Sequence, residues 1–359
     1  FYDLLVALTA RLTGIAPVEL IFRFYPGLFS ILLGVGTYLL SKYLFNKWYI
    51  AFASLFFVYF GGSFGYIVEW LRQKTLGGES AFWANQPVSM NLNPPFAVSL
   101  VLTIASVLVF FLFSKRKNFA TGIVLVILVG ALIEFKVYAG LIILFSLGLV
   151  SVIKLITRRD LSYLKVFIPS LLLSLLVYLP NNSGSQNLVV FSPFWLVDSM
   201  VEFTDRVGWA KLAQAKAAYL SGGVWPKYVL AQALSLAIFI VGNLGTRIIA
   251  LLALPGLIKK KLWQEDSYLF LGIVITASFV PTLLFIQKGN PWNSIQFIYY
   301  FLYFLALFAG LGVVILLKLL PRAVSMTVVV SIILATSISS FSTFRSAFQG
   351  APSRLTNGE

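Results

Sequence analysis

The chain contains neither cysteine nor histidine. The absence of cysteine excludes disulfide bonds, thiolate nucleophiles and thiolate metal sites. The absence of histidine removes the commonest general base at neutral pH and the commonest metal ligand. Any acid–base or metal chemistry must therefore come from aspartate and glutamate, and there are only 12 of these.

Charged residues are also scarce. They make up 11% of the 359 residues, hydrophobic residues make up 59%, and the mean hydropathy is +0.92. Soluble globular proteins have about 25% charged and about 45–50% apolar residues. The apolar runs are continuous, whereas the strands of a membrane β-barrel alternate. The composition therefore predicts an all-α, polytopic bundle of transmembrane helices.

The apolar runs predict about ten membrane spans, because about 20 helical residues cross about 30 Å of hydrocarbon. Residues 119–153 form one run whose only charged side chains are Glu134 and Lys136. It is too long for one span, so we expect two spans joined by a tight turn at 134–140. The expected spans are 27–46, 49–67, 96–114, 119–136, 138–157, 163–180, 232–256, 267–286, 295–317 and 323–341. They form one domain, 1–341, with interfacial helices at 1–26 that Gly14 and Pro17 interrupt, loops at 68–95 and 181–227, and a tail at 342–359.

The net charge of +15 is concentrated on alternate loops. Three acids, Asp160, Glu265 and Asp266, accompany the basic residues of these loops. Those basic residues are Lys42, Lys47, Lys115, Arg116, Lys117, Lys154, Arg158, Arg159, Lys165, Lys259, Lys260, Lys261, Lys318 and Arg322. By the positive-inside rule these loops are cytoplasmic. The excess of basic residues thus reports the orientation of the helices in the membrane and predicts no nucleic-acid partner. The longer loops are expected on the extracytoplasmic side.

Glu134 and Lys136 are the first candidate site residues. Charged groups at membrane depth usually face a cavity, a partner or a substrate. Two interpretations remain open. The two side chains could form an ion pair that fixes the turn, or they could form the floor of a polar pocket on the extracytoplasmic side.

Two further cations are candidates. Arg247 lies about 18 Å from Lys259 at helical rise, too deep to reach the surface easily. It could bind a phosphate, or it could pair with a buried carbonyl or with Asn243. Lys288 lies in a segment that reads either as a binding loop or as a solvated turn.

The loop at 83–95 is rich in amides and held by prolines. Trp83 could stack on a pyranose ring, and the amides that suit sugar hydroxyls are Asn85, Gln86, Asn91 and Asn93. Alternatively, Asn93 before Pro94 is an ordinary helix start. Glu69 precedes this loop as a candidate carboxylate.

Residues 194–220 read as an amphipathic helix with Asp198, Glu202 and Asp205 on one face. It could be an interfacial helix with its acids in water, or a lid over an acceptor site.

The order of the N-terminal motifs resembles the GT-C class of polytopic glycosyltransferases, which includes protein-mannosyltransferase-like and lipid A sugar-transferase-like proteins. The segments that carry the resemblance are Phe1-Tyr2-Asp3-Leu4-Leu5-Val6-Ala7-Leu8, Arg23-Phe24-Tyr25-Pro26-Gly27-Leu28, the span end Tyr38-Leu39-Leu40-Ser41-Lys42-Tyr43-Leu44-Phe45, and the turn Glu134-Phe135-Lys136-Val137-Tyr138. It covers roughly the first 160 residues.

The resemblance implies transfer of a sugar from a polyprenyl-phosphate donor to a lipid, glycan or protein acceptor. We expect this on the extracytoplasmic face of a prokaryotic cytoplasmic membrane, among membrane lipids. The family's catalytic acid is expected upstream of Phe1, with Glu134 and Glu69 as candidates within the chain. Inverting transfer also needs cations or donors for the departing phosphate, and the candidates are Lys136, Arg247, Lys288 and Tyr138. No metal site is predicted, although a divalent cation is left open as a cofactor.

Two other functions fit the same sequence. A transporter or flippase of lipid-linked substrates is one, although no internal repeat is evident. A surface-polysaccharide polymerase or ligase is the other, and it would use a similar donor.

Overall fold

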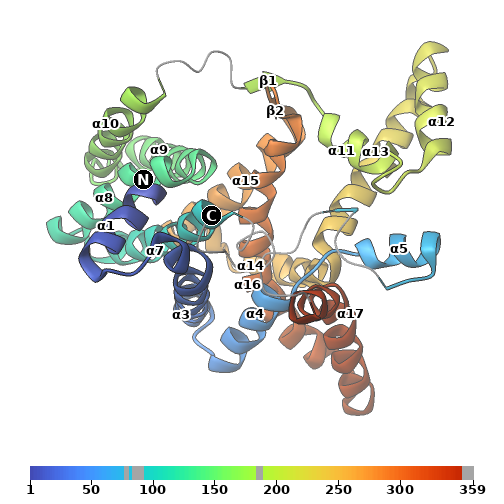
Figure 1. Cartoon of the computed structure of the whole chain (residues 1–359), viewed down its shortest axis with the longest axis horizontal. Helices are drawn as coiled ribbons and strands as arrows, with labels where there is room; N and C mark the ends of the chain where they lie inside the picture. The colour runs from blue at the N-terminus through green and yellow to red at the C-terminus, as the bar shows by residue number, and fades with distance from the viewer. Residues whose placement is uncertain (77–80, 83–92, 183–188, 350–359) are drawn as a thin grey trace.

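The computed structural model describes residues 1–76, 81–82, 93–182 and 189–349, and nearly all of them are helical (Figure 1). The first half contains α1 (Tyr2–Thr13), α2 (Pro17–Glu19), the π-helix η1 (Leu20–Phe24), α3 (Tyr25–Phe45), α4 (Trp48–Phe60), α5 (Gly65–Gln73), α7 (Pro94–Arg116), α8 (Phe119–Phe135), α9 (Val137–Arg158) and α10 (Leu164–Asn181).

The second half begins with the short strand β1 (Val189–Phe191). It continues with α11 (Trp195–Glu202), α12 (Ala210–Ser221), α13 (Trp225–Leu244), the 3-10 helix η2 (Gly245–Ala253), α14 (Leu254–Lys259), η3 (Leu262–Gln264), α15 (Asp266–Leu284), β2 (Phe285–Gln287), η4 (Pro291–Ile295), α16 (Gln296–Leu319) and α17 (Arg322–Gln349). The two strands pair antiparallel, with Val189 opposite Gln287.

Eight helical stretches among the described residues are long and apolar enough to cross a membrane. Two of the ten expected spans have a different form. The span expected at 49–67 is the pair α4 and α5, bent by 43° at residues 61–64. The span expected at 119–136 is α8, an apolar helix of 17 residues. The chain is thus a multi-pass helical membrane protein.

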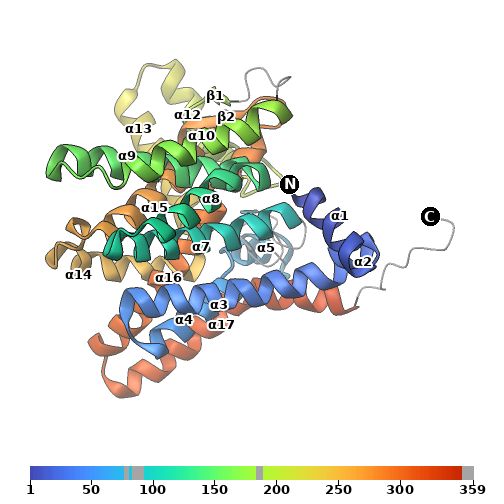
Figure 2. The same cartoon turned by 90° about the vertical axis from the view of Figure 1, so that its left-hand side faces the viewer.

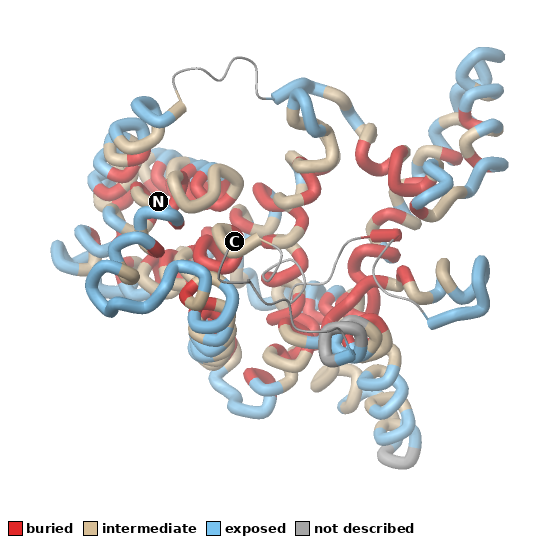
Figure 3. Tube along the Cα trace, in the orientation of Figure 1, coloured by how far each residue is buried: buried red, intermediate tan, exposed pale blue. Residues whose placement is uncertain are grey.

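Helix α16 lies in the interior of the bundle, against α4, η2 and α15. Its Tyr300, Tyr303 and Phe304 are fully buried, and the buried segments gather in the middle of the molecule (Figure 3). Hydroxyl pairs join neighbouring helices here: Ser99 with Tyr300 at 2.6 Å and Thr37 with Tyr303 at 3.2 Å. Such hydrogen bonds between helices contribute about 0.6–2 kcal/mol each in a membrane.

Helices α16 and α4 are in close contact at Gly310. A Cβ there would lie 2.5 Å from the Ser54 backbone nitrogen and 2.8 Å from the Ile50 carbonyl oxygen. We therefore expect Gly310→Ala to lower the free energy of unfolding by about 1–3 kcal/mol, because backbone atoms must move. Gly272→Ala in α15 is the control, since nothing lies within 4 Å of its Cβ position. Thermal unfolding in detergent should separate the two variants, and equal midpoints would contradict this packing.

The long helices run side by side, and α1 and α2 lie beyond one end of them (Figure 2). The α8–α9 turn meets α1 there through an edge-to-face contact between Phe1 and Phe135. We call this end of the bundle, with α1, α2 and the α8–α9 turn, the long-loop end. Glycine 14 adopts a left-handed conformation (φ 72°) and separates α1 from α2, which is the break expected from the sequence.

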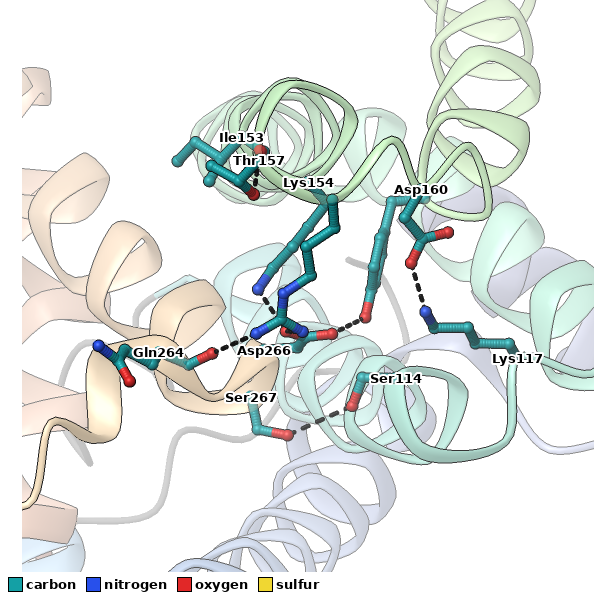
Figure 4. A network of polar contacts seen from close by, with 11 residues as sticks. Ser114, Lys117, Ile153, Lys154, Thr157, Asp160, Gln264, Asp266 and Ser267 are labelled. Atoms are coloured by element: carbon teal, nitrogen blue, oxygen red, sulfur yellow. Dashed lines mark hydrogen bonds and ion pairs between the residues drawn. The ribbon is translucent and has the colours of Figure 1, made fainter.

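The opposite end carries the basic loops, and we call it the basic end. A polar network there joins α7, α9, α10 and α15 (Figure 4). Lys154 pairs with Asp266, whose carboxylate also accepts a hydrogen bond from the Tyr163 hydroxyl. Lys117 pairs with Asp160.

The expectation for residues 194–220 was wrong in its helix boundaries. Helix α11 ends at Glu202, so Asp205 does not share a helical face with Asp198. Asp198 and Glu202 are not free in water either, because the buried Lys216 of α12 contacts them at 2.7 Å and 2.6 Å. Burial alone would favour the neutral amine, but hydrogen bonds from Lys216 to both carboxylates raise its pKa above the usual value. This cluster fastens α12 to α11.

Candidate functional site

Lys136 is the one residue between α8 and α9. Its backbone is extended (φ −159°), so the chain reverses within a single residue. Gly140, one turn into α9, makes this possible, since a Cβ there would come within 2.5 Å of the Ile133 Cα. The tight turn predicted at 134–140 is confirmed.

Glu134 and Lys136 point to different partners. The Glu134 carboxylate accepts a hydrogen bond from the Asn181 Nδ2 at 3.2 Å, whereas the Lys136 ammonium donates to the Asn93 Oδ1 at 3.4 Å. Across the part of the chain that the structure describes, no ion pair joins Lys136 to a carboxylate. The interpretation of a Glu134–Lys136 pair that fixes the turn is therefore wrong.

Two helices begin beside the Lys136 ammonium. Asn93 caps α7 by accepting a hydrogen bond from the Phe96 backbone nitrogen at 3.3 Å, which confirms the helix start read from the sequence. Lys136 itself precedes the first turn of α9. Helix N-termini carry partial positive charge, so this region favours an anion. Burial lowers the pKa of Lys136 to about 8.

Tyr138 extends the site toward β2 and α16. Its hydroxyl donates to the Gln287 Oε1 at 2.6 Å, and its ring packs edge-to-face on Phe297 with centroids 4.9 Å apart. The Lys136 ammonium lies 5.8 Å from the Tyr138 ring centroid. Three segments distant in the sequence therefore contribute to one half-buried polar cluster, Lys136, Asn93, Tyr138 and Gln287, which we call the Lys136 site.

A second cluster lies around Trp292 of η4, directly before α16. The sequence analysis did not identify it. The Arg206 guanidinium lies 4.7 Å from the Trp292 ring centroid, and Trp292 also packs on Trp195 and Phe203. Arg206 is buried and forms an ion pair with Asp205 at 3.4 Å. The tryptophans could have suggested this cluster, but they are 97 positions apart and only the fold brings them together. Indole faces of this kind suit both cations and sugar rings.

Arg247 is fully buried in η2, beneath the bend between α4 and α5. Its guanidinium donates to the carbonyl oxygens of Leu244 (3.1 Å), Gly62 (3.1 Å) and Asn243 (3.2 Å). This is the buried-carbonyl alternative considered from the sequence. Because the guanidinium is engaged by backbone, we do not include Arg247 in the Lys136 site.

The remaining candidates lie around the long-loop end or outside the described residues. Lys288 directly follows Gln287 and is exposed in the turn after β2. Glu69 is half-buried on α5. Trp83, Asn85, Gln86 and Asn91 lie outside the residues that the structure describes. Within the described ranges, no three acidic side chains are placed together as metal ligands.

Compared with known proteins, the chain matches no family model, no curated protein and no solved structure.

Proposed function

We propose that the chain is a membrane glycosyltransferase of GT-C type that binds a polyprenyl-phosphate sugar at the long-loop end, on the extracytoplasmic face. The observation that supports this most is the Lys136 ammonium. It is half-buried, it adjoins the starts of α7 and α9, and among the described residues its hydrogen-bond partner is the neutral Asn93. A cation in this setting is suited to an anionic ligand that approaches from the membrane.

The chemistry of the donor fits this setting. A polyprenyl-phosphate sugar has an apolar chain that stays in the bilayer and a phosphate at the membrane surface. When the glycosidic bond to phosphate breaks, negative charge develops on the leaving oxygen. A fixed ammonium and two helix N-termini stabilise that charge most where water is scarce. Tyr138, held by Gln287, supplies a further polar group beside Lys136.

The sugar and the acceptor need their own contacts. In the proposal, Trp195 and Trp292 form an aromatic surface at which a sugar ring stacks, with Arg206 above Trp292. Inversion also needs a carboxylate that takes the acceptor's proton. Within the chain, Glu134 is the candidate acid nearest to Lys136 in sequence.

A flippase of the same lipid is the second candidate. The bend of 43° between α4 and α5 favours it, because broken spans at membrane depth are common in transporters. A flippase moves the intact donor and leaves the sugar attached. A polymerase or ligase shares the donor and differs in the length of its product.

Measuring how tightly the Lys136→Ala variant binds the donor tests the proposed Lys136 site. One hydrogen bond to a charged group contributes about 1.5–3 kcal/mol, so we expect the dissociation constant of a radiolabelled polyprenyl-phosphate sugar in nanodiscs to rise about 10- to 100-fold. The exposed Lys211 of α12 is the control, and Lys211→Ala should bind as the unchanged chain does. Equal affinity for the two variants would exclude Lys136 as a phosphate ligand. Release of free polyprenyl phosphate on adding acceptor would separate the transferase from the flippase.

A further inference from the structure

A cleft separates α8 from α10 toward the basic end of the molecule. The two helices touch at Gly130, where a Cβ would lie 2.5 Å from the Leu173 Cδ2, and the Ser174 hydroxyl donates to the Gly130 carbonyl at 3.2 Å. Nearer the basic end they enclose a cavity of about 470 Å³. Gly122 lines this cavity, and a Cβ there would have only ordinary contacts at 3.5 Å or more.

The cavity is apolar and opens where the bundle is exposed. Its walls include Ile123, Val126, Ile127 and Val166. Phe119 at its edge is 84% exposed, and Ile123 and Ile127 are exposed as well. In a multi-pass membrane protein, apolar side chains exposed at this depth face lipid chains. The cavity therefore opens sideways to the bilayer and suits a hydrocarbon chain.

The mouth of the cavity is polar and basic. Lys117, Asn118, Ser162 and Lys165 line it at the basic end. The two loops that frame it, 115–118 and 158–165, carry a single acid, Asp160, against Lys115, Arg116, Lys117, Arg158, Arg159 and Lys165. Asp160 is engaged by Lys117. Lys165 is exposed and has no ion pair with any residue that the structure describes. The mouth thus keeps an excess of positive charge.

We propose that this α8–α10 cleft binds an anionic glycerophospholipid from the leaflet at the basic end. One acyl chain occupies the cavity between Gly122, Val126 and Val166, and the phosphate is held by Lys165 together with Lys117. Basic pockets between membrane helices bind lipid headgroups in this way, through charge at the surface and apolar contact below it. The cleft lies at the opposite end of α8 from Lys136, so this site is separate from the proposed donor site.

Two variants test the two halves of the cleft. Val126→Trp fills the cavity, and Lys165→Glu reverses the exposed charge at its mouth without touching the core. Leu334→Trp on the exposed face of α17 and Lys260→Glu in another basic loop are the matched controls. The probe is phosphatidylglycerol, with phosphatidylcholine for comparison, and the readout is native mass spectrometry of the whole chain with affinities from lipid titration.

The unchanged chain should bind phosphatidylglycerol about tenfold more tightly than phosphatidylcholine, and both cleft variants should lose about fivefold or more of that affinity. The control variants should bind as the unchanged chain does. Equal binding of the two lipids, or cleft variants that retain phosphatidylglycerol as the controls do, would overturn the proposal. Lys165→Glu keeps the test valid if Val126→Trp fails to fold, because Lys165 lies at the surface.

Discussion

Replacing Asp266 by alanine is expected to lower the free energy of unfolding by about 3–5 kcal/mol. Asp266 starts α15 and pairs with Lys154 of α9, whose side chain is only 4% exposed (Figure 4). The alanine leaves that ammonium buried without its carboxylate, and it also removes the acceptor of the Tyr163 hydroxyl. Titration with a denaturing detergent in mixed micelles measures the loss.

Two comparisons make the Asp266 result specific. The double variant Lys154→Met, Asp266→Leu removes both charges, so it should be more stable than Asp266→Ala. Lys117→Met breaks the Lys117–Asp160 pair of the same network, but Lys117 is 39% exposed, so the loss should stay within about 1 kcal/mol. Equal losses for Asp266→Ala and Lys117→Met would show that the burial of Lys154 does not determine the effect.

Arg247→Leu is expected to lower the free energy of unfolding by about 3 kcal/mol or more, since each buried carbonyl left unpaired costs about 1–3 kcal/mol. Three carbonyls, those of Gly62, Asn243 and Leu244, lose their donor in this variant. The side chain holds η2 against the residues at the α4–α5 bend, so we expect this bend to loosen. Hydrogen exchange at residues 61–64 and the detergent titration report the two effects.

Arg72→Leu is the matched control for Arg247. Its guanidinium also donates to a backbone carbonyl, that of Val207 at 2.6 Å, but it is exposed and water replaces the lost bond. We expect a change within about 0.5 kcal/mol for this variant. If Arg247→Leu lowered the free energy of unfolding as little as Arg72→Leu does, the hydrogen bonds from Arg247 to backbone carbonyls would not be stabilising the bend.

Local signals in the sequence predicted the local features well. The Asn93–Pro94 start of α7, the break at Gly14 and the reversal at Lys136 each depend on a few neighbouring residues, and the structure has all three. The α4–α5 bend was missed. Gly61-Gly62-Ser63 is a local break signal, but the bend also depends on Arg247, which lies 185 positions after Gly62.

The partners of the candidate residues could not be predicted in the same way. Glu134 and Lys136 are two positions apart, and the sequence allowed an ion pair between them. Helix packing instead brings Asn181 to Glu134 and Asn93 to Lys136. The contact of Arg206 with Trp292 likewise depends on how the segment after α11 folds over η4, which precedes α16. Contacts of this kind follow from tertiary structure and carry no local signal.

The pH dependence of donor binding tests the role of Lys136 most directly. The donor's phosphodiester stays singly charged between pH 6.5 and 9.5, so a change in affinity reports the protein. Lys136 has a lowered pKa of about 8, so its ammonium is present below that pH and is lost as the pH rises through it. We expect constant affinity below about pH 8 and a fall approaching tenfold per pH unit above it. Lys136→Arg should bind with no such fall, because arginine stays charged. An unchanged affinity up to pH 9.5 in the chain with Lys136, or the same fall in Lys136→Arg, would contradict the proposed donor site.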